Sequence, residues 1–116
     1  MIDQKRILVI EDDLGLRAAL CALFRRAFYR TSGASVREGL RLLRSGFEPD
    51  LIIADLWETS PEGDDLLRFL ERTGRREKLL RLSERPRSGA EEEDGCLPDR
   101  ILHREKLLDR VSRMLR

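Results

Sequence analysis

The sequence predicts an α/β fold in which a parallel β-sheet is covered by helices on both faces. Short apolar runs alternate along the chain with segments whose apolar residues recur every three or four positions, the pattern of strands alternating with amphipathic helices. The 116 residues are 41% hydrophobic and 39% charged, which suits a compact core under a solvated surface. We therefore expect residues 1–116 to form a single domain.

The first third of the chain contains two expected strands and two expected helices. The continuous apolar run Ile7–Ile10 is typical of a strand buried on both faces, and Tyr29–Ala34 is a weaker strand candidate. A second helix over Val36–Leu43 should end near Gly46. The helix between these strands is expected over residues 14–28, where apolar residues recur at helical spacing: Leu16, Ala19, Leu20, Leu23, Phe24, Ala27 and Phe28.

Three further strands and two further helices are expected in the rest of the chain. Leu51–Ala54 is a second strong strand, and Leu66–Leu70 marks a helix that ends at Gly74. Leu79–Leu82 and the short run Ile101–Leu102 complete a doubly wound, five-stranded parallel sheet. The last helix has its apolar residues on one side: Leu107, Leu108, Val111, Met114 and Leu115.

The segment between Glu84 and Asp99 has too little apolar surface for the helix that should connect the fourth and fifth strands. Only Ala90, Cys96 and Leu97 are apolar there, so no stripe is available to bury a helix against the sheet. We therefore expect helix four to be short or absent.

Charge and cysteine content argue against several classes of function. The 23 Lys and Arg residues balance 22 Asp and Glu, so no global field attracts nucleic acid or anionic lipid. Cys21 and Cys96 lack partners at zinc-ligand spacing, and Cys21 is expected in the core. The N-terminus MIDQKRILVIEDD is neither a signal peptide nor a membrane span. These observations favour a cytoplasmic protein without a nucleic-acid or membrane partner.

Acidic residues follow two strands that should be neighbours. In a sheet of order 2-1-3-4-5, the first and third strands lie side by side, and ligands bind beyond their carboxyl ends. The first strand ends in Glu11, Asp12 and Asp13, and the third ends in Asp55. Carboxylates about 5 Å apart repel by roughly 3 kcal/mol at an effective dielectric near 20, which a cation such as Mg²⁺ would relieve. The alternative is that these acids cap the first helix, as we expect of Asp13.

The motifs ILVIEDD and DLIIAD, with Ser83 placed 28 residues beyond Asp55, resemble the receiver domain of bacterial response regulators, a flavodoxin-like domain of two-component signalling. The resemblance covers essentially the whole chain. It implies that Asp55 accepts a phosphoryl group from a histidine kinase or phosphotransfer protein. It also implies that Glu11, Asp12, Asp55 and the backbone carbonyl of Trp57 hold Mg²⁺, and that the Ser83 hydroxyl donates to a phosphoryl oxygen.

The second half of the chain departs from the pattern of that family. Its usual Asp-Tyr-Leu-x-Lys-Pro-Phe run reads DRILHRE, so His103 stands in place of the lysine, Arg104 in place of the cis-proline and Arg100 in place of the aromatic rotor. Glu84 follows Ser83 where a small residue is usual. His103 and Ser83 are therefore either parts of the phosphorylation site or strand-end residues without a role in it.

Three hypotheses for the function follow. The first is a phosphorylatable receiver, which is not an enzyme beyond catalysing its own phosphoryl transfer and dephosphorylation, and which signals to an unidentified downstream protein. The second is a pseudo-receiver that acts as a protein-interaction module independently of phosphorylation. The third, a flavin-binding protein or enzyme, is disfavoured because EDDLG stands where a phosphate loop rich in Ser, Thr and Gly would be needed.

Overall fold

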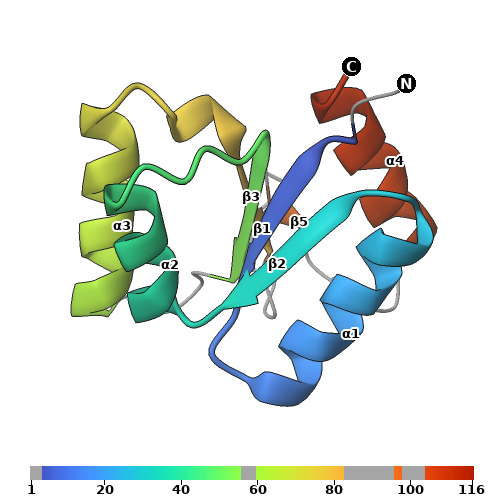
Figure 1. Cartoon of the computed structure of the whole chain (residues 1–116), viewed down its shortest axis with the longest axis horizontal. Coiled ribbons are helices and arrows are strands. Elements are labelled where there is room, and N and C mark those ends of the chain that lie inside the picture. Colours follow the sequence, from blue (N-terminus) through green and yellow to red (C-terminus); the bar gives the residue numbers. More distant parts are fainter. Residues whose placement is uncertain (1–3, 56–59, 83–95, 98–103) are drawn as a thin grey trace, which may run out of the picture.

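A parallel β-sheet of order β2-β1-β3-β4-β5 forms the centre of the protein (Figure 1). The structure is a computed structural model that describes residues 4–55, 60–82, 96–97 and 104–116. The strands are β1 (Arg6–Ile10), β2 (Arg30–Ala34), β3 (Leu51–Asp55), β4 (Leu79–Leu82) and the two-residue β5 (Cys96–Leu97). The predicted α/β class and the order of the first four strands are confirmed.

Helices cover both faces of this sheet. Figure 1 shows α2 and α3 on one side and α1 and α4 on the other. The helices are α1 (Leu14–Arg26), α2 (Val36–Arg44), α3 (Pro61–Arg72) and α4 (Arg104–Met114), with a single 3₁₀ turn, η1 (Arg76–Lys78), before β4. Within the described ranges, no helix has the length and apolar character needed to cross a membrane.

Two predictions for the C-terminal half cannot be compared with the structure. The predicted fifth strand, Ile101–Leu102, lies outside the described residues, and the described β5 is Cys96–Leu97, which pairs with Arg81 and Leu82 of β4. The segment in which helix four was expected to be short or absent, Glu84 to Asp99, is also outside the described part except for Cys96–Leu97, which form β5.

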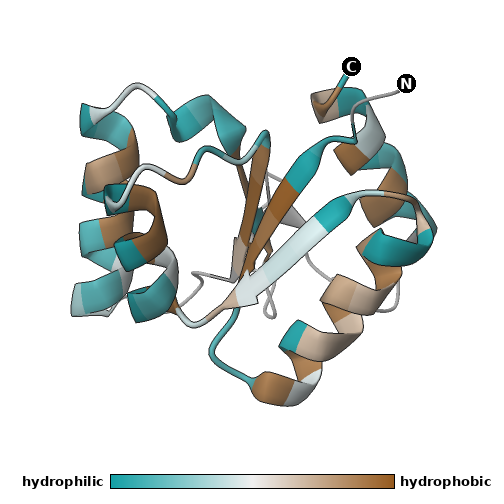
Figure 2. Cartoon of the chain, viewed as in Figure 1, coloured by the Kyte–Doolittle hydropathy of each residue, from teal (hydrophilic) through white to brown (hydrophobic). Residues whose placement is uncertain are grey.

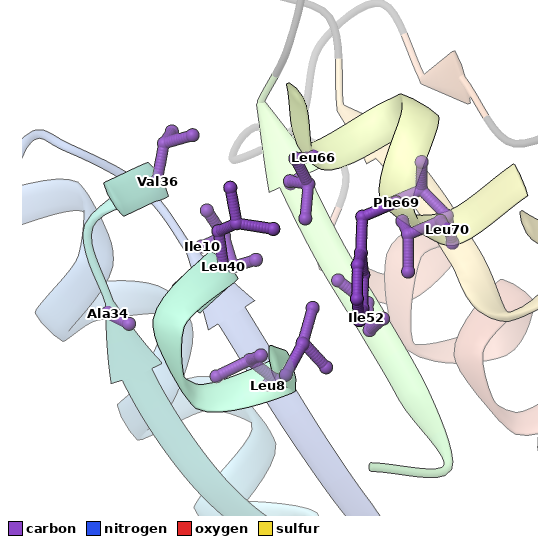
Figure 3. Packing of buried hydrophobic residues seen from close by; sticks show 12 residues of the cluster. Leu8, Ile10, Ala34, Val36, Leu40, Ile52, Leu66, Phe69 and Leu70 are labelled. Atoms are coloured by element: carbon purple, nitrogen blue, oxygen red, sulfur yellow. The ribbon is translucent and has the colours of Figure 1, made fainter. Parts of the chain in front are cut away.

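The central strands are apolar on both faces, as the two helical layers require. Leu8 and Ile10 of β1 face the layer of α2 and α3, where they join Ile52 of β3 in one buried cluster (Figure 3). Ile7 and Val9 face the other layer. Figure 2 shows β1 and β3 as largely brown ribbons between helices that carry both teal and brown segments. This explains why these strands have continuous rather than alternating apolar runs.

Residues of α1 and α4 complete the cluster on the second face. Leu20, Phe24, Leu107 and Val111 are buried there with Cys21, which is 5% exposed and occupies the core position expected from the sequence. Burial raises the pKa of the Cys21 thiol, because the charged thiolate is disfavoured away from water.

A glycine sets the distance between α2 and β1. A Cβ atom added at Gly39 would lie 2.7 Å from Cδ1 of Ile10, closer than real Cβ atoms approach their neighbours. The helix therefore packs directly on the strand whose carboxyl end carries Glu11 and Asp12. This contact fixes the start of α2 close to those carboxylates.

Three helices end in the same left-handed turn, but only two of them use glycine. After α2 and α3, Gly46 and Gly74 adopt positive φ angles of 105° and 72°. After α1 the same role falls to Phe28, with a φ of 69° and 80% of its surface exposed. The N–H of Tyr29 then donates to the carbonyl of Phe24 at 3.1 Å, which closes the turn. A side chain at positive φ is strained, so α1 ends less favourably than the other two helices.

We predict that Phe28→Gly stabilises the protein by about 1 kcal/mol, because glycine relieves a left-handed conformation and little buried apolar surface is lost. Urea unfolding followed by circular dichroism measures the change. The reciprocal substitution Gly74→Ala, at nearly the same φ, should destabilise by a similar amount. A less stable Phe28→Gly variant would show that the exposed ring contributes more to stability than its backbone costs.

Candidate functional site

The carboxyl ends of β1 and β3 place the predicted acidic residues next to each other. Ile10 of β1 is the register partner of Ala54 of β3, so Glu11 and Asp55 follow at the same level on neighbouring parallel strands. Asp55 is the last residue of β3 and is paired in register with Leu82 of β4. The side chain of Asp55 lies outside the described part of the structure. The adjacency of the two strands, on which the predicted site depends, is thus present in the backbone.

Glu11 is a buried carboxylate with one unused oxygen. The residue is 8% exposed, and its backbone N–H donates to the carbonyl of Ala34 at 2.9 Å. Its Oε2 accepts from the N–H of Asp13 at 3.1 Å, and its carbonyl accepts from Nη1 of Arg17 at 3.2 Å. Its Oε1 is buried and has no hydrogen-bond partner among the described residues. A buried neutral group without a hydrogen-bond partner costs about 1–3 kcal/mol of stability, and a charged group costs more.

Asp12 has a structural partner that the sequence did not indicate. Its Oδ1 accepts from the backbone N–H of Val36, the first residue of α2, at 2.9 Å. The N-terminal N–H groups of a helix have no partner within the helix, so this bond satisfies one of them and joins the loop after β1 to α2. Asp12 itself is exposed, and the bond uses one of its two oxygens. The second oxygen therefore remains available to a ligand.

A capping box next to this bond fixes the start of α2. The hydroxyl of Ser35 accepts from the N–H of Glu38 at 3.1 Å, and the Glu38 carboxylate accepts from the N–H of Ser35 at 3.1 Å. These hydrogen bonds to Ser35 lower the pKa of the exposed Glu38 carboxyl. The start of α2 is thus fixed by the two capping-box bonds and is joined to the loop after β1 by the bond between Asp12 and Val36.

Asp13 and Ser60 cap the two other helices that begin near the site. Asp13 Oδ1 accepts from the N–H of Leu16 at 2.9 Å, which confirms the predicted cap of α1. Ser60 caps α3 by accepting from the N–H of the buried Gly63 at 3.0 Å. Three helices therefore start at the edge of the sheet where the acidic residues lie.

A shallow hollow lies between the starts of α2 and α3. Its volume is about 370 Å³, and the exposed Arg37 of α2 and Glu62 of α3 form an ion pair of 3.5 Å across these helix starts. The hollow is lined by Asp12, Ser35, Val36, Arg37, Ser60 and Glu62. Exposed pairs contribute little to stability because water screens them. Arg37 and Glu62 were not candidates at the level of sequence, since neither belongs to an acidic or metal-binding motif.

Several predicted site residues lie outside the described part of the structure. They are Trp57, Ser83, Glu84, Arg100 and His103. For Arg104 the backbone begins α4, and its side chain is not described. Among the residues whose positions are described, no three His, Cys, Asp or Glu side chains gather into a metal-binding group. The magnesium site that includes the Asp55 carboxylate is therefore still a prediction.

Comparisons with known proteins identify the fold. No family model and no curated protein matches the sequence. Among solved structures, the chemotaxis response regulator CheY4 of Vibrio cholerae is 20% identical with a TM-score of 0.75, and the match covers 97% of this chain and 100% of that chain. The response regulator TrrA of Thermotoga maritima, solved in complex with Mg(2+)-BeF, is 24% identical with a TM-score of 0.75 and the same coverage of both chains.

A third match comes from the crystal structure of histidine kinase ThkA in complex with the response regulator TrrA, with 20% identity, a TM-score of 0.77 and coverage of 97% of this chain and 100% of that chain. At these identities the shared property is the fold. The chain therefore has the fold of response regulator receiver domains, as the resemblance of its sequence motifs led us to expect.

We predict that the two oxygens of Asp12 have separable roles. Asp12→Ala should destabilise the protein by about 0.5–2 kcal/mol, because the Val36 N–H loses its acceptor. Asp12→Asn should cost much less, since its amide oxygen can still accept that bond. Urea unfolding of both variants in the absence of divalent ions makes the comparison, and equal losses would mean that the charge of Asp12 rather than its hydrogen bond stabilises the fold.

Proposed function

We propose that this chain is a receiver domain that accepts a phosphoryl group on Asp55 from the phosphohistidine of a histidine kinase or phosphotransfer protein, with Mg²⁺ as cofactor. The observation that carries the proposal is the buried Glu11 carboxylate, whose Oε1 has no partner among the described residues. It lies at the end of the strand that neighbours Asp55. A protein retains such a costly group where a ligand completes it.

The residues of this edge fit a magnesium ion. Carboxylate oxygens are the ligands that Mg²⁺ prefers, and it commonly uses one or two of them together with phosphate oxygens and water. Glu11, Asp12, Asp55 and the carbonyl of Trp57 would hold the ion, with the second oxygen of Asp12 still free of the Val36 bond. When bound, Mg²⁺ neutralises charge on the carboxylates and on the phosphoryl oxygens. The presence of Mg(2+)-BeF in the structure of TrrA supports this choice of ion.

The proposed chemistry is an in-line displacement by the Asp55 carboxylate. One of its oxygens forms a bond to phosphorus as the phosphorus–nitrogen bond of the donor phosphohistidine breaks, and the electron pair remains on the imidazole nitrogen. Ser83 donates a hydrogen bond to a phosphoryl oxygen of the product, and His103 supplies a positive charge when it is protonated. The transfer involves no oxidation or reduction.

The proposed partners follow from this chemistry. The complex of ThkA with TrrA supports a histidine kinase as the donor, and a downstream protein would read the phosphorylated state. Such a relay places the chain in the cytoplasm and makes it a signalling phosphoacceptor rather than an enzyme with a separate substrate.

The second candidate function is that of a pseudo-receiver, an interaction module that does not depend on phosphorylation. The bond between Asp12 and Val36 favours it, because this bond gives one of the proposed metal ligands a purely structural task. The substitutions around Ser83 and His103 in the sequence favour it as well. The two candidates differ in a single measurable property, the reactivity of Asp55.

We predict that a small phosphodonor such as acetyl phosphate modifies Asp55 only when Mg²⁺ is present. Intact-mass measurement should show one added phosphoryl group, and chelation of Mg²⁺ should remove the modification. Asp55→Asn should abolish it, whereas Asp65→Asn, at an exposed carboxylate of α3, should not change it. Glu11→Gln should lower the rate at least about tenfold, the effect of about 1.4 kcal/mol on the barrier.

An unmodified wild-type chain at saturating Mg²⁺ and donor would contradict the phosphoacceptor and support the pseudo-receiver. Modification that persists in Asp55→Asn would assign the phosphoryl group to another residue.

A further inference from the structure

Within the described part of the chain, no strand pairs with the outer edge of β2. Figure 1 shows β2 as the edge strand, with α1 and α2 on opposite sides of the sheet and no described helix or strand along its free edge. The N–H of Arg30 donates to the carbonyl of Lys5, and the carbonyl of Ala34 accepts from Glu11, so alternate residues of β2 direct their backbone groups toward β1. Thr31 and Gly33 therefore direct theirs outward.

Most of these outward groups have no partner in the described part of the chain. The carbonyl of Thr31 accepts from Nη2 of Arg25 at 3.0 Å. The N–H of Thr31 and both backbone groups of Gly33 make no hydrogen bond to any described residue. An edge strand with free backbone groups is a template for another strand.

A hollow of about 460 Å³ lies beside the first half of this edge. It is lined by Arg6, Arg25, Tyr29, Arg30, Thr31, Ser32 and Phe47. Consecutive residues of a strand point to opposite faces of the sheet, so a hollow lined by the first three residues of β2 reaches the edge of the strand and does not lie on one face alone. An extended chain would occupy this space.

The hollow is positively charged. Arg6 of β1 and Arg30 of β2 are register partners at its base, and Arg25 reaches it from α1. None of the residues that line the hollow is acidic, and none of these three guanidinium groups forms an ion pair with a described acidic residue. The nearby Asp50 carboxylate accepts from the backbone N–H of Arg6 at 2.8 Å and not from its guanidinium. Guanidinium groups bind carboxylates by charge-assisted, often bidentate hydrogen bonds.

We propose that the edge of β2 binds an extended acidic segment of a partner protein as an additional strand. The segment offers carbonyls to the N–H groups of Thr31 and Gly33 and carboxylates to the three arginines. A second copy of this chain fits less well, because its own β2 edge, Arg30–Ala34, offers no carboxylate to these arginines.

This site is independent of the phosphorylation proposed above. Arg6 and Arg30 are the first residues of β1 and β2, whereas Glu11 and Asp55 lie at the opposite, carboxyl end of the sheet. A partner bound along β2 would leave the proposed phosphorylation site at Glu11 and Asp55 uncovered.

The test uses the full chain and a fluorescein-labelled ten-residue peptide of alternating Glu and Val, titrated by fluorescence anisotropy at physiological ionic strength. We predict saturable binding of this peptide and none of the matching Lys and Val peptide. An acidic peptide of the same charge with proline at alternate positions should bind at least about tenfold more weakly, because proline cannot donate a backbone hydrogen bond.

Variants of the protein locate the site. Arg30→Glu and Arg6→Glu should each weaken binding at least about tenfold, equivalent to about 1.4 kcal/mol. Thr31→Pro removes an outward N–H that β1 does not use, and it should weaken binding while circular dichroism shows an intact fold. Arg68→Glu on α3 makes the same change of charge far from β2 and serves as the control.

The proposal would be overturned by no binding of the acidic peptide, by equal binding of its proline version, or by an equal loss in Arg68→Glu. A dimer in sedimentation equilibrium that is lost in Thr31→Pro would overturn it by assigning the edge to a second copy. Tighter binding of a single-stranded oligonucleotide than of the peptide, through the same arginines, would also overturn it.

Discussion

A buried carboxylate at the junction of two parallel strands is the constraint around which this structure is organised. Glu11 leaves the end of β1 with its side chain removed from water and one oxygen without a partner in the described chain. None of the described arginine or lysine side chains pairs with this carboxylate. The guanidinium of Arg17 donates to the backbone carbonyl of Glu11 instead. The described part of the structure thus positions the Glu11 carboxylate without pairing it with a cation.

The elements around Glu11 keep that carboxylate and its neighbours in fixed positions. The Ala34 carbonyl and the Asp13 N–H bind Glu11 from two sides, and Asp12 is anchored to the first residue of α2. Gly39 allows α2 to pack directly on Ile10, which keeps that anchor close to β1. A site assembled from rigid helix starts and strand ends requires little rearrangement when a ligand binds, which is the condition for effective electrostatic stabilisation.

Strongly patterned features of the fold could be predicted from the sequence. The branched runs of β1 and β3 have few alternatives to a buried strand, and the helical spacing of apolar residues predicted α1 and α3. The cap at Asp13 was predictable because its partner, Leu16, is only three residues away. The adjacency of Glu11 and Asp55 followed from the strand order alone.

Features that depend on tertiary geometry could not be predicted in this way. The partner of Asp12 is 24 residues away in the chain, and an aspartate next to a predicted metal ligand gives no sign that it also anchors a distant helix. Phe28 is part of a helical pattern, so nothing in the sequence indicates that it stands in a left-handed turn. The arginines along β2 are separated in the sequence and come together only through the register of β1 with β2 and the position of α1.

The account is tested most directly by the effect of Mg²⁺ on the free energy of unfolding of the wild-type chain and of Glu11→Gln. Without Mg²⁺, the neutral variant should be at least as stable as the wild type, because it keeps an acceptor for the Asp13 N–H and removes a buried charge. With Mg²⁺ at about 100 times its Kd, the wild type should gain about 2.7 kcal/mol, and Glu11→Gln should gain almost nothing. A variant that is less stable without Mg²⁺ and gains as much from it as the wild type would contradict the claim that the Glu11 carboxylate is retained for a metal ion.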